Sequence, residues 1–195
     1  AGTFSSGTAT ATLTINKANL TITADNKTKV FNTANPTLTM SYAGFVYGQT
    51  SSVLAPAPLI NTTAVVNSPV GSYPITLTGG AAANYNINLV NGVLNVTSAN
   101  SGIAFSNISK TYGDASFNVA ATTNSPGAIT YSITSGASFV SITPAGQVTI
   151  TGAGTVRIQA NQVAGCGYNP GTATATLTIS KANLSITADN QSNIY

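Results

Sequence analysis

Hydrophobic and polar residues alternate in short stretches along most of the chain. Residues 8–15 alternate threonine with alanine, leucine or isoleucine, and residues 20–24 alternate leucine, isoleucine and alanine with threonine. A period of two places one class of side chain on each face of a β-strand, and threonine favours that surface because it is β-branched. No segment carries apolar residues at helical spacing over three turns. The pattern therefore predicts an all-β protein.

Turn residues divide this pattern into short strands. Asn26-Lys27-Thr28 is expected to interrupt the first strand, and the glycine-bracketed segment 44–48 is expected to be a loop or a short distorted strand. Asn91-Gly92 lies between two alternating runs and predicts a β-hairpin, because both turn residues need a positive φ. Pro56, Pro58 and Pro69 argue against a helix or a central strand at their positions. Further strands are expected at residues 30–31, 38–42, 59–66, 73–77, 85–89, 93–96, 117–121, 128–134, 139–142, 148–150, 156–160 and 172–179.

The chain contains an internal repeat. The stretch Thr8 to Asn26 returns almost unchanged at Thr172 to Asn190, with an offset of 164 residues. A weaker repeat has half that period: Ile22, Asn26, Lys29 and Phe31 match Ile103, Asn107, Lys110 and Tyr112 at an offset of 81, and Tyr85 and Leu94 match Tyr168 and Leu177 at 83. Repeats must be recognised before a fold is assigned. The longer repeat is therefore made of two related units of about 80 residues.

Each unit predicts seven or so short strands with turn signals every 8 to 12 residues, which is typical of an all-β sandwich. We therefore expect tandem antiparallel β-sandwich (Ig-like) domains in an extended array. The predicted domains are residues 1–17, the last strand of a preceding sandwich; 18–97, one sandwich; 98–181, a second; and 182–195, the first strand of a following sandwich. With almost no spacer at Asn16-Lys17-Ala18, neighbouring domains are expected to be stiffly coupled.

Composition excludes several classes of protein. Charged residues make up only 5% of the chain and the net charge is +3, from six basic residues that do not cluster as a nucleic-acid-binding face requires. The chain has no uninterrupted run of about 18 apolar residues, so no membrane span is predicted. The single cysteine, Cys166, has no partner for an internal disulfide and is expected to be a small hydrophobic or loop residue. Ala1 to Phe4 lack the features of a signal peptide, so an exported protein would carry its signal further upstream.

The inventory of reactive side chains argues against catalysis. There is no histidine or glutamate, and the three carboxylates are Asp25, Asp114 and Asp189. General acid–base catalysis needs groups within hydrogen-bond reach, whereas Asp25 and Asp189 occupy equivalent positions in successive units and are expected to lie far apart. Each aspartate is expected to bind turn backbone, and three isolated carboxylates make a calcium cage improbable. We therefore predict no enzyme and no catalytic, cofactor-binding or metal-binding residues.

Three further features of the sequence bear on possible sites. Lys29 and Lys110 occupy equivalent strand positions, where a lysine–asparagine cross-link is conceivable, but a solvated lysine is the simpler expectation. Tyr73 could form a tyrosine corner or pack in the core. A carbohydrate-binding face would need exposed aromatic rings, for which the candidates are Tyr42, Phe45, Tyr47 and Tyr131.

The motifs of the first unit resemble the MBG domain of giant bacterial surface proteins, especially those of Bacteroidota. They are residues 17–26 (KANLTITADN), Asn35-Pro36, Gly44-Phe45, residues 70–75 (VGSYPI), and residues 84–96. The motifs of the second unit are similar to the bacterial Ig-like repeats that alternate with that domain; they are residues 110–114 (KTYGD), 150–156, 168–170 and 177–179. The chain departs from the family at residues 30–33, where a Tyr-Gly-Asp-like turn is usual.

The resemblance implies a stalk or fibre segment of a repetitive adhesin at the cell surface. It implies secretion, often by the type 9 route, and no catalytic residues. The expected partners are neighbouring repeats of the same chain, with no nucleic acid. Two alternatives remain open: a carbohydrate-binding module that contacts surface glycans, or a subunit of an extracellular filament in which copies exchange the terminal strands, residues 8–15 and 182–195.

Overall fold

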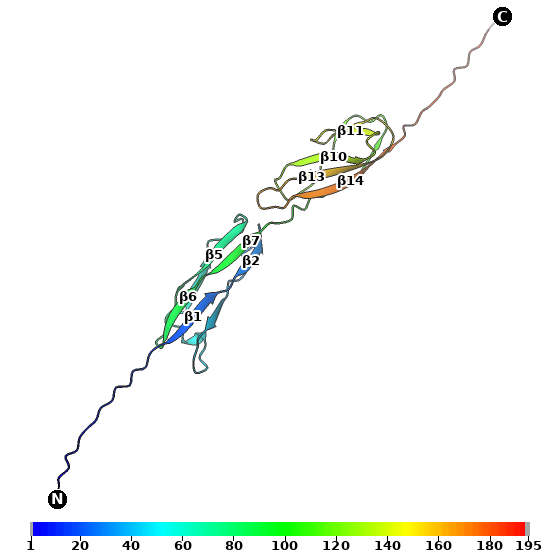
Figure 1. Ribbon diagram of the computed structural model, residues 1–195. Helices are drawn as coiled ribbons and strands as arrows, with labels where there is room; N and C mark the ends of the chain where they lie inside the picture. The colour runs from blue at the N-terminus through cyan, green and yellow to red at the C-terminus, as the bar shows by residue number, and fades with distance from the viewer. Residues whose placement is uncertain (1, 194–195) are drawn as a thin grey trace. The chain divides into compact units, whose positions relative to one another are not determined.

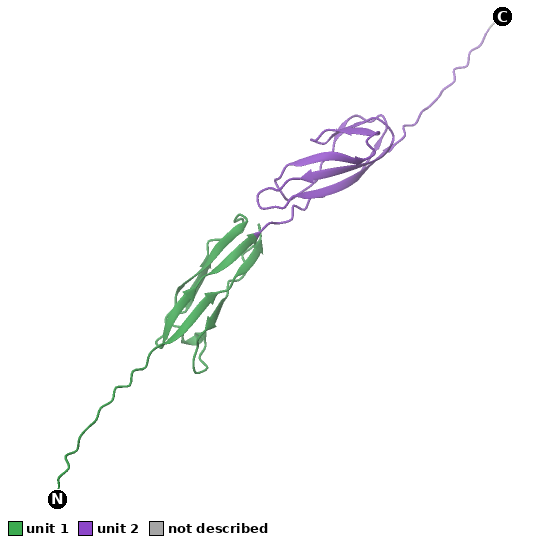
Figure 2. Ribbon diagram, viewed as in Figure 1, with its two compact units in different colours: residues 1–96 green, residues 97–195 purple. Residues whose placement is uncertain are grey.

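In the computed structural model, the described residues are 2–193, and they divide into two compact units, unit 1 up to residue 96 and unit 2 from residue 97 onward (Figure 2). The described residues form fourteen β-strands and one short 3₁₀-helix, η1 (Ser51–Val53) (Figure 1). The prediction of an all-β protein built from β-sandwich units is confirmed.

Unit 1 consists of a three-stranded and a four-stranded sheet, with strand orders β3-β1-β6 and β2-β7-β5-β4. Its first and sixth strands pair in parallel, while the β1–β3, β4–β5 and β5–β7 pairs are antiparallel. The strands are β1 (Ala18–Ala24), β2 (Lys27–Val30), β3 (Met40–Ala43), β4 (Pro58–Thr62), β5 (Gly71–Gly79), β6 (Tyr85–Val90) and β7 (Gly92–Thr97).

Unit 2 has the same division into a four-stranded and a three-stranded sheet, with orders β10-β13-β14-β8 and β11-β12-β9. Unit 2 also has one parallel pair, β8–β14, which here joins the first strand of the unit to its last strand, and the other pairs are antiparallel. The strands are β8 (Ile108–Thr111), β9 (Phe117–Asn118), β10 (Ile129–Ser135), β11 (Val140–Ile142), β12 (Gln147–Ile150), β13 (Gly154–Gln162) and β14 (Gly171–Ser180).

The weaker repeat in the sequence corresponds to repeated backbone pairing. Ala18 pairs in parallel with Tyr85 in unit 1, and Ala99 forms a parallel bridge with Tyr168 in unit 2. The N–H of Ala18 donates to the carbonyl of Asn84 at 3.0 Å, and the N–H of Ala99 donates to that of Gly167 at 2.9 Å. The backbone contacts of Ala18 in unit 1 thus recur at Ala99 in unit 2, at the offsets of 81 and 83 residues found in the sequence. The two units are variants of one sandwich.

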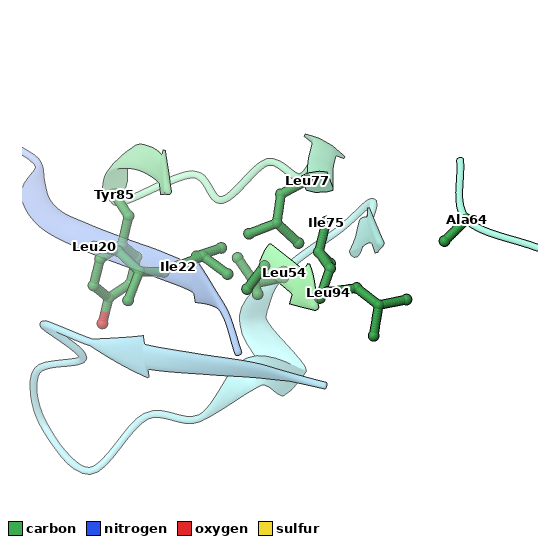
Figure 3. Close-up of a cluster of buried hydrophobic side chains, with 9 residues drawn as sticks. Leu20, Ile22, Leu54, Ala64, Ile75, Leu77, Tyr85 and Leu94 are labelled. Atoms are coloured by element: carbon green, nitrogen blue, oxygen red, sulfur yellow. The ribbon is translucent and has the colours of Figure 1, made fainter. Parts of the chain in front are cut away.

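The core of unit 1 lies between its two sheets and is formed by the residues that alternate along its strands (Figure 3). Leu20 and Ile22 on β1, Ile75 on β5 and Leu94 on β7 have no exposed surface. Leu54 and Ala64 add side chains from the connecting segments. Burying side chains of this size contributes roughly 1.5–3 kcal/mol each, so this alternation is the main determinant of the sandwich. An equivalent cluster in unit 2 includes Val156, Ile158 and Leu177.

The predicted hairpin at Asn91-Gly92 is wrong. The strand β6 belongs to the three-stranded sheet and β7 to the four-stranded sheet, so the chain passes from one sheet to the other at this dipeptide. Neither residue has the positive φ of a hairpin turn. A Cβ atom on Gly92 would lie 2.4 Å from the carbonyl oxygen of Ala24, and the side chain of Asn91 accepts a 3.1 Å hydrogen bond from the N–H of Leu77. The glycine is required by close backbone approach rather than by turn geometry.

A smaller expectation in unit 1 also differs from the structure. Lys27 and Thr28 do not interrupt the chain but begin β2, which is in the other sheet from β1, so the break falls at Asp25-Asn26. Pro58 is the first residue of β4, which is the edge strand of its sheet, so the expectation that no central strand lies at this proline is confirmed. Tyr73 forms the corner-type contact: its hydroxyl donates to the carbonyl of Pro69 at 2.9 Å.

The repeated stretch adopts complementary structures in its two copies. Residues 172–180 lie in β14 between β13 and β8, whereas the strand expected at residues 8–15 is not formed, and residues 2–17 are exposed. Residues 18–24 form β1, whereas residues 182–193 of the other copy form no strand. The sequence is nearly the same, so the difference arises because a strand needs neighbours to pair with. Residues 1, 194 and 195 of the predicted segments 1–17 and 182–195 lie outside the described residues, and the assignment of these segments to further domains stays a prediction.

Candidate functional site

The three aspartates occupy separate local environments. Asp114 accepts a 2.9 Å hydrogen bond from the N–H of Thr111 in the turn after β8, as expected for a turn carboxylate. Asp25 instead accepts a 2.6 Å hydrogen bond from the hydroxyl of Thr39, and Asp189 lies in the exposed segment after β14. Within residues 2–193 no three carboxylate, thiol or imidazole side chains gather as a metal ion would require. Cys166 is an exposed loop residue with a φ of 38°.

The two equivalent lysines have different surroundings. Lys29 is only 5% exposed, and its ammonium group donates to the backbone carbonyls of Thr33 at 3.0 Å, Val65 at 2.5 Å and Val66 at 3.2 Å. The expectation of a solvated lysine is therefore wrong for Lys29, which joins β2 to the loop after β4. Lys110 in unit 2 lies with its ammonium group 4.7 Å from the centre of the Phe117 ring. Both lysines make structural contacts inside their own unit.

The turn that follows each of these lysines has the same form. Thr33 N–H donates to the carbonyl of Val30 at 3.2 Å, and Asp114 N–H donates to that of Thr111 at 3.0 Å. Asn32 has a φ of 62° where unit 2 has Gly113 at 100°. Asparagine tolerates this left-handed region better than other residues with a side chain. The departure from the Tyr-Gly-Asp pattern in unit 1 therefore preserves the turn.

The four aromatic residues considered for carbohydrate binding do not form one face. Tyr131 packs on the core of unit 2, and its hydroxyl accepts the N–H of Ala121 at 2.8 Å. Phe45 packs on the core of unit 1, with its ring centre 5.7 Å from those of Tyr42 and Tyr85. Tyr42 is 36% exposed and Tyr47 is 98% exposed. Only Tyr47 presents its whole ring to solvent.

The loop that carries Tyr47 is attached to a buried residue. The hydroxyl of Tyr85, a core residue of β6, accepts the N–H of Val46 at 3.1 Å and donates to the side chain of Gln49. The N–H of Gln49 closes the loop on the carbonyl of Val46 at 3.1 Å. Tyr47 itself has a φ of 54°, which is unusual for a bulky residue. Hydrogen bonds therefore attach the 44–49 loop to the core, and the loop presents the ring of Tyr47 to solvent.

This loop contributes to a concave surface at the start of unit 1, which we call the Tyr47 surface. It is a hollow of about 450 Å³ beside the chain entering β1. Its walls come from the 44–49 loop, the residue before β6 and the segment before β1: Ile15, Asn16, Lys17, Ala18, Val46, Tyr47, Gln49 and Asn84.

A second concave surface lies at the end of unit 2, and we call it the Tyr112 surface. It is an open hollow of about 560 Å³ beside the chain leaving β14. Tyr112 is 49% exposed, and its N–H donates to the carbonyl of Ser180, the last residue of β14, at 2.8 Å. The other lining residues are Thr151, Gly152, Ala153, Lys181, Ala182, Asn183 and Leu184.

Sequence reasoning singled out Tyr47 but not the surface around it. Gln49, Asn84 and Thr151 are unremarkable polar residues in the sequence, and only the fold brings them to the ends of the units. A signal was nevertheless present: both surfaces border the repeated stretch, at Lys17 in one copy and Lys181 in the other.

Comparisons with known proteins bear on fold and family. A search of curated proteins gives no match. Among solved structures, the chain is similar to Drosophila N-cadherin EC1-3, with 9% identity, a TM-score of 0.35, and coverage of 86% of this chain and 69% of that one. It is also similar to the titin domains z1z2 in complex with telethonin, with 16% identity, a TM-score of 0.37, and coverage of 87% and 100%. Likenesses this weak add nothing to the fold described above.

The family comparison concerns unit 1. Residues 20–95 match the family model described as MBG domain (YGX type), and the match runs from the third residue of β1 to within two residues of the end of β7. Within the described residues, no helix has the length and hydropathy needed to cross a bilayer. The resemblance of the first unit to the MBG domain, inferred from its motifs, is confirmed for residues 20–95.

Proposed function

We propose that this chain is a structural stalk segment of a repetitive bacterial cell-surface adhesin, which extends a binding tip away from the cell. The MBG match and the β-sandwich units support an extracellular repeat protein. The alternation with Ig-like repeats, an origin in Bacteroidota and secretion by the type 9 route are parts of this proposal. The chain acts mechanically and has no catalytic role.

The observation that carries the proposal is the position of the parallel strand pairs. In unit 2, residues 108–111 of β8 pair with residues 177–180 of β14, so an early strand is bonded directly to the last one. In unit 1, residues 18–23 of β1 pair in parallel with residues 85–90 of β6. Tension on a chain pulls the early strand toward its N-terminus and the late strand toward its C-terminus. This tension acts on two parallel partners as a shear along the strands. All the hydrogen bonds between the two strands must then break at once, so the pair resists unfolding by force.

Single-molecule force spectroscopy on the full chain, held at its two ends, tests this role. We expect two unfolding events, one for each unit. Ser109→Pro in β8 should lower the unfolding force of unit 2, because proline removes a donor and distorts the strand that pairs with β14. The matched control is Ser132→Pro in β10, the opposite edge strand of the same sheet. Equal losses of force for the two variants would refute the role of the parallel pair.

Carbohydrate binding is a second candidate, and the full exposure of Tyr47 is the observation that favours it. A sugar that stacks on an aromatic side chain needs an accessible ring. In the 44–49 loop, Tyr47 provides such a ring, whereas Phe45 packs on the core. A glycan array probed with the full chain and with Tyr47→Ala tests it: signals that the substitution removes support this candidate. The absence of any signal for the unmodified chain excludes it for the glycans on the array.

Strand exchange between copies has weaker support. The exposed residues 8–17 and 182–193 could pair elsewhere, but β1 and β14 already occupy the central positions that their copies would take. An incoming strand would have to displace a nearly identical strand of the same chain, which has the advantage of covalent attachment. Sizing of the full chain should give a monomer; a ladder of oligomers would support exchange instead.

A further inference from the structure

The conformation of Tyr47 is not explained by the stability of unit 1. A left-handed backbone costs a residue with a side chain on the order of 1–2 kcal/mol, and Tyr47 adopts it at a φ of 54°. Its ring is 98% exposed and so gains nothing from burial within the unit. Strained residues of this kind cluster at active sites, ligand clamps and switch regions. The combination of strain and full exposure indicates that the ring is held ready for a contact.

The loop around Tyr47 limits the freedom of that ring. Gly44, at a φ of 112°, is in close backbone approach to Asn19: a Cβ atom there would lie 2.2 Å from the Asn19 carbonyl oxygen. Phe45 meets the ring of Tyr85 edge-on at 82°. A loop fixed before binding loses little conformational entropy when it binds. The part of the Tyr47 surface that the 44–49 loop forms is therefore pre-organised.

The internal repeat shows what such a surface could meet. Lys17 borders the Tyr47 surface and Lys181 borders the Tyr112 surface, and the two lysines occupy the same place in the repeated stretch. Where a copy of unit 1 follows unit 2, β14 ends at Ser180 and the next β1 starts at the counterpart of Ala18. Two Cα steps of 3.8 Å separate these positions, so the strand ends lie within roughly 8 Å. In such an array residues 182–184 form the start of the next β1, and residues 15–16 form the end of the preceding β14. What remains of the two surfaces is Tyr112 with residues 151–153 on one side and the 44–49 loop with Asn84 on the other, with a single lysine between them.

We propose that the Tyr47 surface docks on the Tyr112 surface of a preceding copy of unit 2. Tyr47 packs into the hollow against the half-exposed ring of Tyr112, and the small residues Gly152 and Ala153 leave room for it. The aliphatic stem of the shared lysine covers the edge of the contact while its ammonium group stays in water. The occupant of the Tyr112 surface is thus a second copy of unit 1. This inference rests on the proposed function to the extent that both require repeats in series.

A tandem protein tests the contact. Residues 1–181 are followed directly by residues 18–195, which keeps every residue of the chain and joins a second copy through the natural sequence of the junction. Tyr47→Ser in the second copy and Tyr112→Ser in the first copy each remove one side of the contact. The matched controls are the same two substitutions in the opposite copies, Tyr47 in the first and Tyr112 in the second, where no unit supplies the other surface.

Hydrogen exchange of residues 151–153 in the first copy and 44–49 in the second is the measurement. We expect each junction substitution to lower protection at both segments, and the pair to be non-additive by about 2- to 12-fold, the range for an aromatic pair. The control substitutions should change only the loop that carries them. Additive effects, or equal effects in both copies, overturn the docking.

Chemical accessibility separates docking from carbohydrate binding. Tyrosine nitration read by mass spectrometry should modify Tyr47 of the first copy faster than Tyr47 of the second. Equal rates overturn the contact, and equal rates together with glycan signals from the tandem protein assign Tyr47 to carbohydrate binding instead. Force spectroscopy of the same tandem protein measures the mechanical resistance of the parallel strand pairs, whether or not the two surfaces dock. A failed contact therefore leaves the proposed stalk role separately measurable.

Discussion

The side-chain oxygen of Asn26 accepts a 2.8 Å hydrogen bond from the backbone N–H of Val93, and the Asn107 oxygen accepts one of the same length from Thr176. The two pairs are equivalent in the weaker repeat. In unit 1 this bond lies where β1 gives way to β2 and β6 to β7, so it joins the two places at which the chain changes sheets.

We expect Asn26→Ala and Asn107→Ala each to destabilise their own unit. Alanine leaves a backbone donor without its partner, which costs about 0.5–1.5 kcal/mol for a hydrogen bond between neutral groups. Urea denaturation of the full chain, followed by a probe in each unit, measures the effect. Asn88→Ala on the exposed side of β6 is the control and should change stability by no more than about 0.5 kcal/mol.

Lys29→Met should destabilise unit 1 by about 1.5–3 kcal/mol. Methionine fills a similar space but cannot donate to the carbonyls of Thr33, Val65 and Val66, and a hydrogen bond to a charged group contributes about 1.5–3 kcal/mol. The matched variant is Lys110→Met, which loses only a contact with an aromatic ring, typically about 0.5–1 kcal/mol at such a site. If the two variants were equally stable in thermal denaturation, the carbonyl contacts of Lys29 would have no special weight.

Gly92→Ala should be among the most damaging single changes in unit 1. The added methyl would lie 2.4 Å from the Ala24 carbonyl oxygen, so the strands must separate where the sheets meet. Steric overpacking in a core costs roughly 1–3 kcal/mol and occasionally more. Gly7→Ala is the control, because nothing lies within 4 Å of its Cβ position. Denaturant midpoints for both variants decide the matter, and a tolerated Gly92→Ala would mean that the crossing is loose.

Ser101→Ala should leave unit 2 as stable as before or more so. The hydroxyl of Ser101 is buried and, within the described residues, has no hydrogen-bond partner. Burying such a group costs about 1–3 kcal/mol, which sets the upper limit of the gain. Ser125→Ala is the matched control: its buried hydroxyl accepts the N–H of Gly127 at 3.1 Å, so its loss should destabilise. Differential scanning calorimetry distinguishes the two outcomes.

Tyr47→Asn should stabilise the isolated chain by about 1 kcal/mol, because asparagine tolerates the left-handed backbone that tyrosine adopts at cost. Tyr47→Ala keeps that cost and should bring no comparable gain. Thermal midpoints of the two variants provide the comparison. A gain with alanine as large as that with asparagine would show that ring exposure, and not backbone strain, is the unfavourable feature.

The sequence predicted local structure better than pairing. Alternation along residues 20–24, 73–77 and 172–179 located β1, β5 and β14, since a half-buried strand must alternate. The same rule placed a strand at residues 8–15, where none forms, because alternation does not supply a neighbour. Asn91-Gly92 has the composition of a hairpin, but its conformation is set by Ala24, nearly seventy residues earlier in the chain.

The candidate sites were less accessible to sequence reasoning. The buried ammonium group of Lys29 donates to the carbonyls of Val65 and Val66. These residues are distant in the sequence, so the residues around Lys29 do not predict its burial. Tyr131 and Phe45 pack on the cores and Tyr47 does not, although all three are aromatic residues with similar neighbours in the sequence. Only the fold distinguishes a ring that packs inside from one that projects.

The positions of β7 and β14 also govern the order in which this protein can fold as it is synthesised. Each is the last strand of its unit, and each lies in the interior of a sheet, between β2 and β5 or between β13 and β8. A growing chain therefore cannot close either core until that final strand has emerged, at residue 97 for unit 1 and residue 180 for unit 2. Folding should then advance in steps of about one unit, with a partly open sheet exposed between steps.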